Sequence, residues 1–379
     1  MILSISIIEN EKEFEELHSQ WDNLLKVSAA NSIFLTHEWL FTWWRHFGKG
    51  KRLSIITIRR EGELIGIAPL MCRKLVPACF KQGGILEFIG TPFNDEADFM
   101  AHKDFFRDAL SAITRFLIKD YPLWDIINLR EIPVASLTLK ILNETAGENK
   151  ILCSNWIRSI SPFIKTGGGW NKFIKDKGSK FRNNLKRAER LAGQAGQIEY
   201  EVFKEQDITD EVIKRVFDVE RRSWKEKGGT PLLSGERNRK FFGDIGKIFS
   251  LKNWMVVYIL KLDGRDIAFQ MCFDYNEKIW EYTTAYDRDY SKVSPGTMIL
   301  NIVVKDTFDK KKREYDFLRG DEQYKRMWAE DKREMMQIGI VKKGIYPLLY
   351  FYINMKLRAI LNKNPILVSI YDTLMRKFN

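Results

Sequence analysis

The chain has 379 residues and a mass of 44.6 kDa. That is more than one hydrophobic core usually absorbs, so two domains are expected. Hydrophobic residues make up 45% of the chain and the mean hydropathy is −0.31, which excludes a mainly disordered protein. No stretch without a charged residue exceeds twelve residues, well short of the ~20 apolar residues that span a bilayer. The N-terminal sequence MILSISIIENEKEF predicts no secretory signal.

Cysteine and histidine usage predicts no metal site. The four cysteines, Cys72, Cys79, Cys153 and Cys272, have no ligand spacing. This pattern suits a reducing cytoplasm. The chain has only four histidines, so a histidine-based metal site is not expected either.

The positive charge is concentrated in two segments. The net charge is +12 and the pI is about 9.3. Residues 171–190 hold eight basic and two acidic residues, and residues 341–379 hold seven and one. Each segment needs its own explanation as an anion site, a membrane contact or a solvated face.

The expected elements occur in the same order in both halves of the chain. In the first half we expect helices over 11–27 and 36–47, a hairpin over 53–72 turning at Glu61-Gly62, a strand over 86–90, a helix over 102–119 and a strand over 124–130. In the second half we expect helices over 207–227 and 234–249, a hairpin over 255–273 turning at Asp263-Gly264, a strand over 278–287, a loop over 288–295, a helix over 296–310 and a strand over 315–320. An acidic-Gly pair between β-branched runs is a hairpin turn, because glycine tolerates positive φ.

This repetition predicts an α/β fold of two tandem lobes. Each lobe would be a mixed, mostly antiparallel sheet flanked by helices, and 161–169 would be a short connection. The predicted domains are 1–164, 165–340 and a basic amphipathic helical tail over 341–379.

The strand–loop–helix step of each lobe is where such a fold can bind an anion, since a helix N-terminus offers unpaired N–H groups. In the second lobe this step reads Ser294-Pro295-Gly296-Thr297 after Lys292. In the first lobe residues 91–98 contain three carboxylates, which would repel a pyrophosphate. A phosphate-bearing ligand is therefore expected in the second lobe, and ordinary helix capping is the alternative.

Two segments of the second lobe resemble a known family. They are 282–300, YTTAYDRDYSKVSPGTMIL, and 315–328, YDFLRGDEQYKRMW. They resemble the GNAT-type acetyltransferases of the bacterial CelD-like, cellulose-biosynthesis group, which is related to the FemAB peptidoglycan aminoacyl transferases. The resemblance covers residues 30–340 and implies a double GNAT fold, an acyl-thioester donor in the second lobe and an amine acceptor in a cleft between the lobes.

The chain departs from the family pattern in its phosphate loop. A typical loop reads Arg/Gln-x-x-Gly-x-Gly/Ala, whereas the equivalent positions here are Ser291, Ser294 and Gly296, so only the last glycine is kept. No long heptad run is present, which argues against the FemAB branch with its helical arm. The co-substrate that the resemblance implies is acetyl-CoA or another acyl-CoA, and no metal is implied.

Direct acyl transfer to an amine needs a polarised carbonyl and a positioned amine, without a protein nucleophile. By resemblance, a splayed strand would supply the backbone donor near Thr284, Ala285 and Tyr286. The residues expected to hold the donor are these three together with Lys292, Ser294, Gly296 and Thr297.

Three places offer catalytic side chains. Asp287 ends the strand beside the predicted donor loop and is either a general base or an Asx turn. Asp98 is the carboxylate of the corresponding first-lobe loop; FemAB resemblance gives it a substrate-binding role, and helix capping is the alternative. Glu322, Tyr324 and Lys325 follow an apolar strand end, where ligands gather in open α/β sheets, with Arg319 as a substrate-binding candidate. Tyr324 could return a proton to the leaving thiolate.

The basic segment 171–190 predicts a helix with Lys180, Arg182 and Arg187 on its polar faces. These residues would bind an anionic acceptor, a sugar phosphate or lipid-linked glycan, or form a solvated face. A sugar ring could stack on Trp39, Trp43, Trp44 or Trp224, although aromatic residues at helical spacing are typical of a core. Nucleic acid is not an expected partner, because no recognition module is visible.

The predicted function is an N-acyltransferase that moves an acyl group from acyl-CoA to an amine on a cell-surface polysaccharide precursor. The alternatives are a FemAB-like transferase that uses aminoacyl-tRNA and a non-catalytic scaffold for a membrane polysaccharide synthase. The expected location is cytoplasmic. The tail would either contact an anionic inner-membrane surface or dock on the protein itself.

Overall fold

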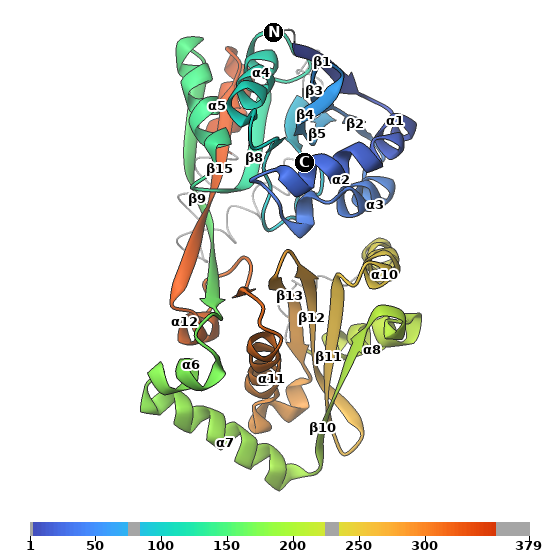
Figure 1. Cartoon of the computed structure of the whole chain (residues 1–379), viewed down its shortest axis with the longest axis vertical. Coiled ribbons are helices and arrows are strands. Elements are labelled where there is room, and N and C mark those ends of the chain that lie inside the picture. Colours follow the sequence, from blue (N-terminus) through green and yellow to red (C-terminus); the bar gives the residue numbers. More distant parts are fainter. Residues whose placement is uncertain (1–2, 75–83, 224–234, 354–379) are drawn as a thin grey trace. The chain divides into compact units, whose positions relative to one another are not determined.

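The computed structural model describes residues 3–74, 84–223 and 235–353. The chain forms two compact units, Met1–Ser159 with Glu334–Asn379, and Ile160–Arg333. We call them unit 1 and unit 2 (Figure 1). Strand β9 (Leu152–Lys165) and strand β15 (Asp331–Val341) each run from one unit into the other. Trp224 and the tail beyond residue 353 lie outside the described residues.

Unit 1 is built on two groups of strands. Their orders are β1-β3-β4-β7 and β15-β8-β6-β5-β2. The strands are β1 (Leu3–Ile8), β2 (Lys51–Leu53), β3 (Ile55–Arg60), β4 (Glu63–Ala68), β5 (Leu70–Lys74), β6 (Gly84–Phe88), β7 (Met100–Ala101) and β8 (Ile126–Pro133). The helices are α1 (Glu11–Glu16), α2 (His18–Val27), α3 (His37–Phe47), α4 (Phe106–Lys119), α5 (Leu137–Glu148) and α13 (Ile345–Phe351).

The pairing of β15 settles where its residues fold. Met335–Val341 pair with Ile126–Pro133 of β8, and residues from Glu334 onward belong to unit 1, whereas the sequence grouped residues 334–340 with the second lobe. The core of unit 1 includes Ile338 and Ile340 of β15 beside Ile127 and Leu129 of β8.

The helices of unit 1 bury their apolar faces. Helix α4 places Ala109, Ile113 and Leu117 in the core against the strands. Trp39 and Trp43 of α3 are 0% and 2% exposed. Their expected place in the core is confirmed, and neither is available to stack on a sugar.

Unit 2 has one run of six strands, in the order β10-β11-β12-β13-β14-β9. The strands other than β9 are β10 (Ile198–Lys204), β11 (Met255–Leu262), β12 (Arg265–Tyr275), β13 (Lys278–Tyr286) and β14 (Glu314–Asp316). The helices are α6 (Trp170–Asp176), α7 (Ser179–Ala195), α8 (Asp210–Arg221), α10 (Glu236–Leu251), α11 (Pro295–Asp309) and α12 (Gln323–Trp328).

Both predicted hairpins are present, and their turns have the expected chemistry. Glu61 and Gly62 have φ of 51° and 90°, and Asp263 and Gly264 have φ of 48° and 78°. Positive φ at both central residues matches the right-handed twist of the strands that they join. The turns therefore fix the registers of β3–β4 and β11–β12.

Two expectations for the linking region were wrong. Residues 161–165 form the end of β9 and pair with β14 through Phe163–Asp316 and Ile164–Tyr315. The basic helix is also broken, because Gly178 separates α6 from α7. Phe173 and Ile174 of α6 pack against the core of unit 2, and Phe181 and Leu185 of α7 are buried in it.

The sheet of unit 2 is covered on both faces. Val303 and Val304 of α11 pack with Tyr258 and Leu260 of β11. On the other side, Phe249 of α10 lies 5.2 Å from the ring of Phe273, centroid to centroid. Within the described residues, no helix has the length and apolarity needed to cross a membrane.

Candidate active site

The strands β13 and β14 of unit 2 part after three residue pairs. They are parallel and pair at Lys278–Glu314, Ile279–Tyr315 and Trp280–Asp316. Strand β14 ends at Asp316, whereas β13 continues to Tyr286. Along its other edge β13 stays paired with β12 as far as Ala268–Tyr286. The edge of β13 from Glu281 to Tyr286 therefore faces a split that β14 does not fill.

The backbone along this split offers hydrogen-bond donors. The N–H of Asp287 donates to the carbonyl of Ile267, on the β12 side, at 2.8 Å. Because N–H directions alternate along an antiparallel strand, the N–H groups of Tyr286 and Thr284 point to the opposite edge. Both residues belong to the set predicted to supply the backbone donor, and the hydroxyl of Thr284 is turned away to the carbonyl of Phe269 at 2.9 Å.

A β-bulge lies where the split opens. Met271 pairs with Thr283 and Cys272 pairs with Glu281, so Tyr282 is the extra residue on β13. Bulges re-aim the side chains around them and are frequent beside active sites. The neighbouring residue, Glu281, is the first of β13 beyond the β14 ladder.

Glu281 is a buried carboxylate that two phenols contact. It is 4% exposed. The hydroxyl of Tyr315 donates to Oε2 at 2.5 Å and that of Tyr324 donates to Oε1 at 3.1 Å. Gln270 Nε2 donates to the Tyr315 oxygen. These donors stabilise the buried negative charge.

Both phenols are held in their protonated form. The pKa values of Tyr315 and Tyr324 are raised well above the ordinary value of tyrosine. Burial is the largest cause, and the negative charge of Glu281 is the second. Tyr324 therefore keeps its proton at neutral pH and acts as a donor. The sequence singled out Tyr324 but missed Glu281 and Tyr315.

The predicted cluster around Tyr324 forms one turn. Lys325 is 5% exposed and donates from Nζ to the carbonyl of Arg319 at 2.8 Å. Its Nζ also lies 3.2 Å from Oε2 of Glu322, whose side chain is 55% exposed. Lys325 thus holds the turn that carries Tyr324, and the side chain of Arg319 is exposed.

The predicted donor loop leads from the end of β13 into α11. Ser294 has the left-handed φ of 55° and makes no capping hydrogen bond with its side chain. Its carbonyl accepts the N–H groups of Thr297 and Met298. A Cβ on Gly296 would lie 3.2 Å from Cδ1 of Tyr286, so the first turn of α11 packs on the strand that borders the split. Ala285, one residue before Tyr286, is buried.

Asp287 is engaged in ion pairs. It is 1% exposed, and its Oδ2 lies 2.7 Å from Nε of Arg222 and 3.1 Å from an Nη of Arg265. Its Oδ1 accepts the N–H of Asp289. This is the Asx turn that the sequence left open as the alternative. The base role of Asp287 stays a prediction that this pairing does not favour.

The basic residues of α7 are near the same loop. Helix α7 contacts the 3-10 helix Arg288–Val293, which contains the exposed Lys292. Lys180 and Arg187 are exposed on α7, whereas Arg182 donates to the carbonyl of Lys175 at 3.0 Å. Lys180, Arg187 and Lys292 thus leave positive charge on neighbouring elements of unit 2.

Asp98 lies in unit 1. It is 7% exposed, and its Oδ1 accepts the N–H of Phe99 at 2.8 Å. Burial raises the pKa of Asp98 to about 6. Hydrogen bonds from Ser136, Thr138 and Phe99 lower the pKa, but by less than burial raises it. Its predicted role in substrate binding stays a prediction.

Residues 179–326 match the family model of the acetyltransferase (GNAT) domain. No curated protein sequence matches the chain. Three solved structures are similar in fold. FemX has a TM-score of 0.58 at 12% identity over 92% of this chain and 99% of that chain. The C-terminal domain (DUF2156) of a protein described as a lysylphosphatidylglycerol synthetase from Agrobacterium fabrum has a TM-score of 0.55 at 11% identity over 90% and 95%. L-PGS from Bacillus licheniformis has a TM-score of 0.53 at 12% identity over 87% and 94%.

Unit 2 therefore contains an acetyltransferase (GNAT) domain, and the predicted fold class is confirmed. The prediction that the chain is a GNAT-type N-acyltransferase is confirmed at the level of this domain, which includes β13, β14 and the first turn of α11. At 11–12% identity the solved structures show a shared fold alone. The narrower CelD-like resemblance stays a prediction.

Proposed function

We propose that the chain transfers an acyl group from an acyl-CoA thioester directly to an amine, with the donor bound by unit 2. The observation that supports this most is the split between β13 and β14, which begins at the buried carboxylate of Glu281. A thioester carbonyl in this split would meet the N–H groups of Thr284 and Tyr286. Donors aimed at a developing oxyanion usually contribute more to catalysis than any other single effect.

The residues at the split account for the proton transfers. As the amine nitrogen bonds to the acyl carbon and the carbon–sulfur bond breaks, the amine gives one proton to Glu281 and the thiolate takes one up. The hydroxyl of Tyr324 is hydrogen-bonded to Oε1 of Glu281. Tyr324 therefore donates its proton to the leaving sulfur and recovers a proton from the newly protonated carboxyl group of Glu281. The balance needs no further acid, base or metal.

The phosphates of the donor would bind at the start of α11. The N-terminus of this 15-residue helix has a positive dipole end, and Ser294 keeps its hydroxyl out of capping. Lys292 and the exposed basic side chains of α7 add positive charge near this helix start. Lys180, Arg187 and Arg319 remain candidates for binding an anionic acceptor.

The acceptor that we propose is an amine-bearing sugar or lipid-linked glycan precursor, as the CelD-like resemblance implies. The part of the basic tail beyond residue 353, which lies outside the described residues, would hold the protein against an anionic membrane surface. Deleting residues 354–379 should release the chain from vesicles containing anionic lipid. The deletion begins there because Phe351 is fully buried in unit 1. Binding that survives the deletion would exclude the tail as the anchor.

Transfer from aminoacyl-tRNA is a second candidate, and the exposed basic face of α7 favours it. Lys180, Lys186, Arg187 and Arg190 are all exposed on this helix, a pattern that suits a polyanion.

Thermal unfolding with and without CoA separates these candidates. A ligand at 100 times its Kd adds about 2.7 kcal/mol, so ~1 mM acetyl-CoA should raise the midpoint clearly. Gly296→Arg should remove the shift. Gly296→Ala is the control, because its Cβ already meets Tyr286 and so measures the packing cost alone. No shift with wild-type protein, but one with aminoacyl-tRNA, would favour the second candidate.

Glu281→Gln tests the chemistry itself. The assay measures CoA thiol released from acetyl-CoA when a panel of amino sugars is offered as acceptors. Glu281→Gln should lower kcat in this assay by about 10²–10⁴-fold and keep the CoA-induced shift of the unfolding midpoint. Glu87→Gln is the matched control, since Glu87 of β6 is also 4% exposed but lies in unit 1. Equal turnover in wild type and Glu281→Gln would remove Glu281 from the mechanism.

A further inference from the structure

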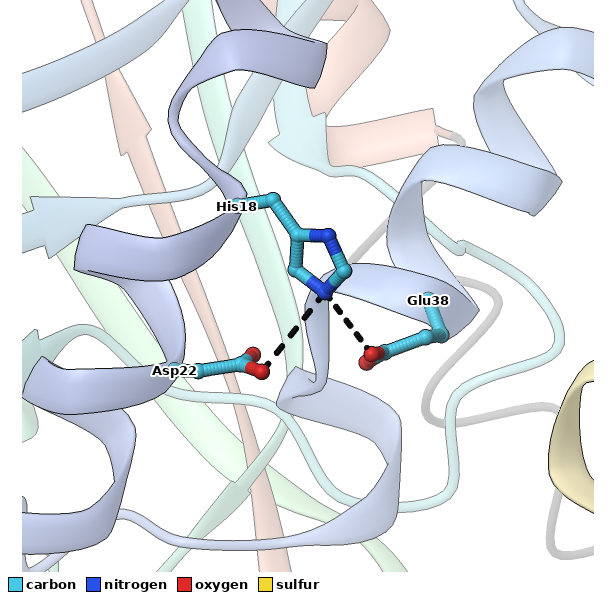
Figure 2. Close-up of side chains that lie close together, drawn as sticks. All are labelled: His18, Asp22 and Glu38. Atoms are coloured by element: carbon cyan, nitrogen blue, oxygen red, sulfur yellow. Dashed lines mark hydrogen bonds and ion pairs between the residues drawn. The ribbon is translucent and has the colours of Figure 1, made fainter. Parts of the chain in front are cut away.

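We propose that unit 1 contains a binding site for a first-row transition metal, best suited to Zn²⁺, formed by His18, Asp22 and Glu38. The site lies outside the acyl-transfer machinery proposed for unit 2. Its donors are one ring nitrogen and two carboxylate oxygens, a set that suits zinc. Figure 2 shows the three side chains directed toward one another from two helices.

The helices bring these donors together by simple geometry. His18 is the first residue of α2, and Asp22 follows one turn later on the same face. Glu38 lies in the first turn of α3, whose start is fixed by Thr36, which accepts the N–H of Trp39. Since α2 and α3 contact each other, the Glu38 carboxylate reaches the face that presents His18 and Asp22.

The separations of the donor atoms match a small tetrahedral ion. Nε2 of His18 lies 2.9 Å from Oε1 of Glu38 and 3.6 Å from Oδ2 of Asp22, and the donor atoms all lie within 4.8 Å of one another. Ligands about 2.0–2.2 Å from Zn²⁺ are themselves about 3.3 Å apart. The two separations from Nε2 are close to this spacing, and a water would complete the coordination.

The ring of His18 is held in the orientation that the site requires. It stacks on His37, with centroids 4.4 Å apart and an angle of 15° between the planes. His37 is fixed in turn by a 2.8 Å hydrogen bond to the carbonyl of Phe14. Packing that locks a ligand's ring lowers the cost of binding a metal. The His18 side chain is 46% exposed, so the ion can reach it from solvent.

The charges in the cluster suit a divalent cation. Nε2 of His18 can carry one proton and so can donate to only one carboxylate at a time. The Glu38 side chain is only 5% exposed, and a carboxylate in that setting gains from a nearby positive charge. A divalent ion would accept lone pairs from all three groups at once.

The test is metal titration of the full chain after removal of metals by chelation. One equivalent of Co²⁺ should bind and give the visible absorption of a low-symmetry site, and Zn²⁺ should displace it and raise the unfolding midpoint. Asp22→Asn and His18→Ala should each raise the Kd by at least about 10-fold. Asp22→Asn changes a partly exposed side chain, so it keeps the test valid if His18→Ala fails to fold.

His102→Ala is the matched control. His102 also lies beside a carboxylate, with Nδ1 3.7 Å from Asp104 Oδ2, but the described residues supply no third ligand there. Its loss should leave the metal titration unchanged. Absence of stoichiometric binding, or binding that is lost with His102 instead of His18, would overturn the proposal and leave an ordinary His–Glu pair between two helices.

Discussion

Asp98 offers a stability prediction whose size and sign follow from its surroundings. Its carboxyl group is buried in unit 1, and burial outweighs the hydrogen bonds from Ser136, Thr138 and Phe99, so its pKa is raised from 3.8 to about 6. Asp98→Asn keeps the shape and the acceptor oxygen that receives the Phe99 N–H. It removes only the charge that forms when the proton leaves.

The raised pKa makes the folded state less stable at neutral pH than in mild acid. Between pH 4 and 6 the unfolded chain has released this proton while the folded chain still holds it, so the free energy of unfolding falls as pH rises. A pKa difference of about two between the folded and unfolded chains corresponds to about 3 kcal/mol, and the whole cost is present above pH 6. Asp98→Asn should therefore raise the stability by up to about 3 kcal/mol at pH 7 and change it little at pH 4.

Urea unfolding of both proteins at pH 4, 5, 6 and 7 measures this difference. Asp120→Asn, at an exposed position after α4, is the control and should give no pH-dependent gain. A stability difference between Asp98→Asn and wild type that is constant over the four pH values, or that favours wild type at pH 7, would refute the argument. If Asp98 also binds the acceptor, the same variant should lose kcat/KM while it gains stability, as strained functional residues do.

Three further predictions concern unit 2. Asp287→Asn should lower the free energy of unfolding by about 1.5–3 kcal/mol, the usual value of hydrogen bonds to charged groups, because it weakens the contacts with Arg222 and Arg265; an unchanged urea midpoint would contradict this. Tyr324→Phe should lower kcat by about 10²-fold or more and leave the CoA-induced thermal shift intact, and the steady-state rate of CoA release shows whether it does. Gly264 has φ 78°, so Gly264→Ala should lower the free energy of unfolding by about 1–2 kcal/mol. Gly193→Ala in α7 places its Cβ with nothing within 4 Å and should raise the free energy of unfolding by about 0.5–1 kcal/mol. Equal unfolding midpoints for the two variants would show that the turn conformation is not the cause.

Features specified by neighbouring residues were predictable from the sequence. The hairpins at Glu61-Gly62 and Asp263-Gly264 depend on two residues that accept positive φ. The start of α11 follows from Pro295 in the first helical turn. The donor loop was also predictable, because the strand before it and the helix after it each have a clear local sequence pattern.

Features that depend on distant pairing were not predictable. The end of β9 was expected to be a loop, because its partner β14 lies about 150 residues later in the chain. Glu281 was missed because only its hydrogen bonds with Tyr315 and Tyr324, 34 and 43 residues away in the chain, mark it as a site residue. A single acid within the apolar strand KIWEYTTAY was the available signal. The four-residue spacing of His18 and Asp22 was also visible, but Glu38 joins them only through the packing of α2 and α3.

The two lobes place a buried carboxylate at corresponding positions of their parallel strand pairs. In unit 1, β6 and β8 are parallel and pair at Ile85–Ile126 and Leu86–Ile127, and the next residue of β6 is the buried Glu87. In unit 2, the last pair is Trp280–Asp316 and the next residue of β13 is the buried Glu281. The two carboxylates thus occupy the same position in the repeated topology.

Their partners differ in a way that decides their chemistry. Glu87 lies 3.1 Å from Nε of Arg73 and 3.6 Å from an Nη of Arg130, and Asn128 donates to it at 3.0 Å. Glu281 accepts hydrogen bonds from two phenols. The guanidinium groups beside Glu87 stay protonated at any pH the protein survives and offer no proton for exchange, whereas a phenol can give up and recover a proton. Replacing Glu87 should therefore cost stability and replacing Glu281 should cost turnover.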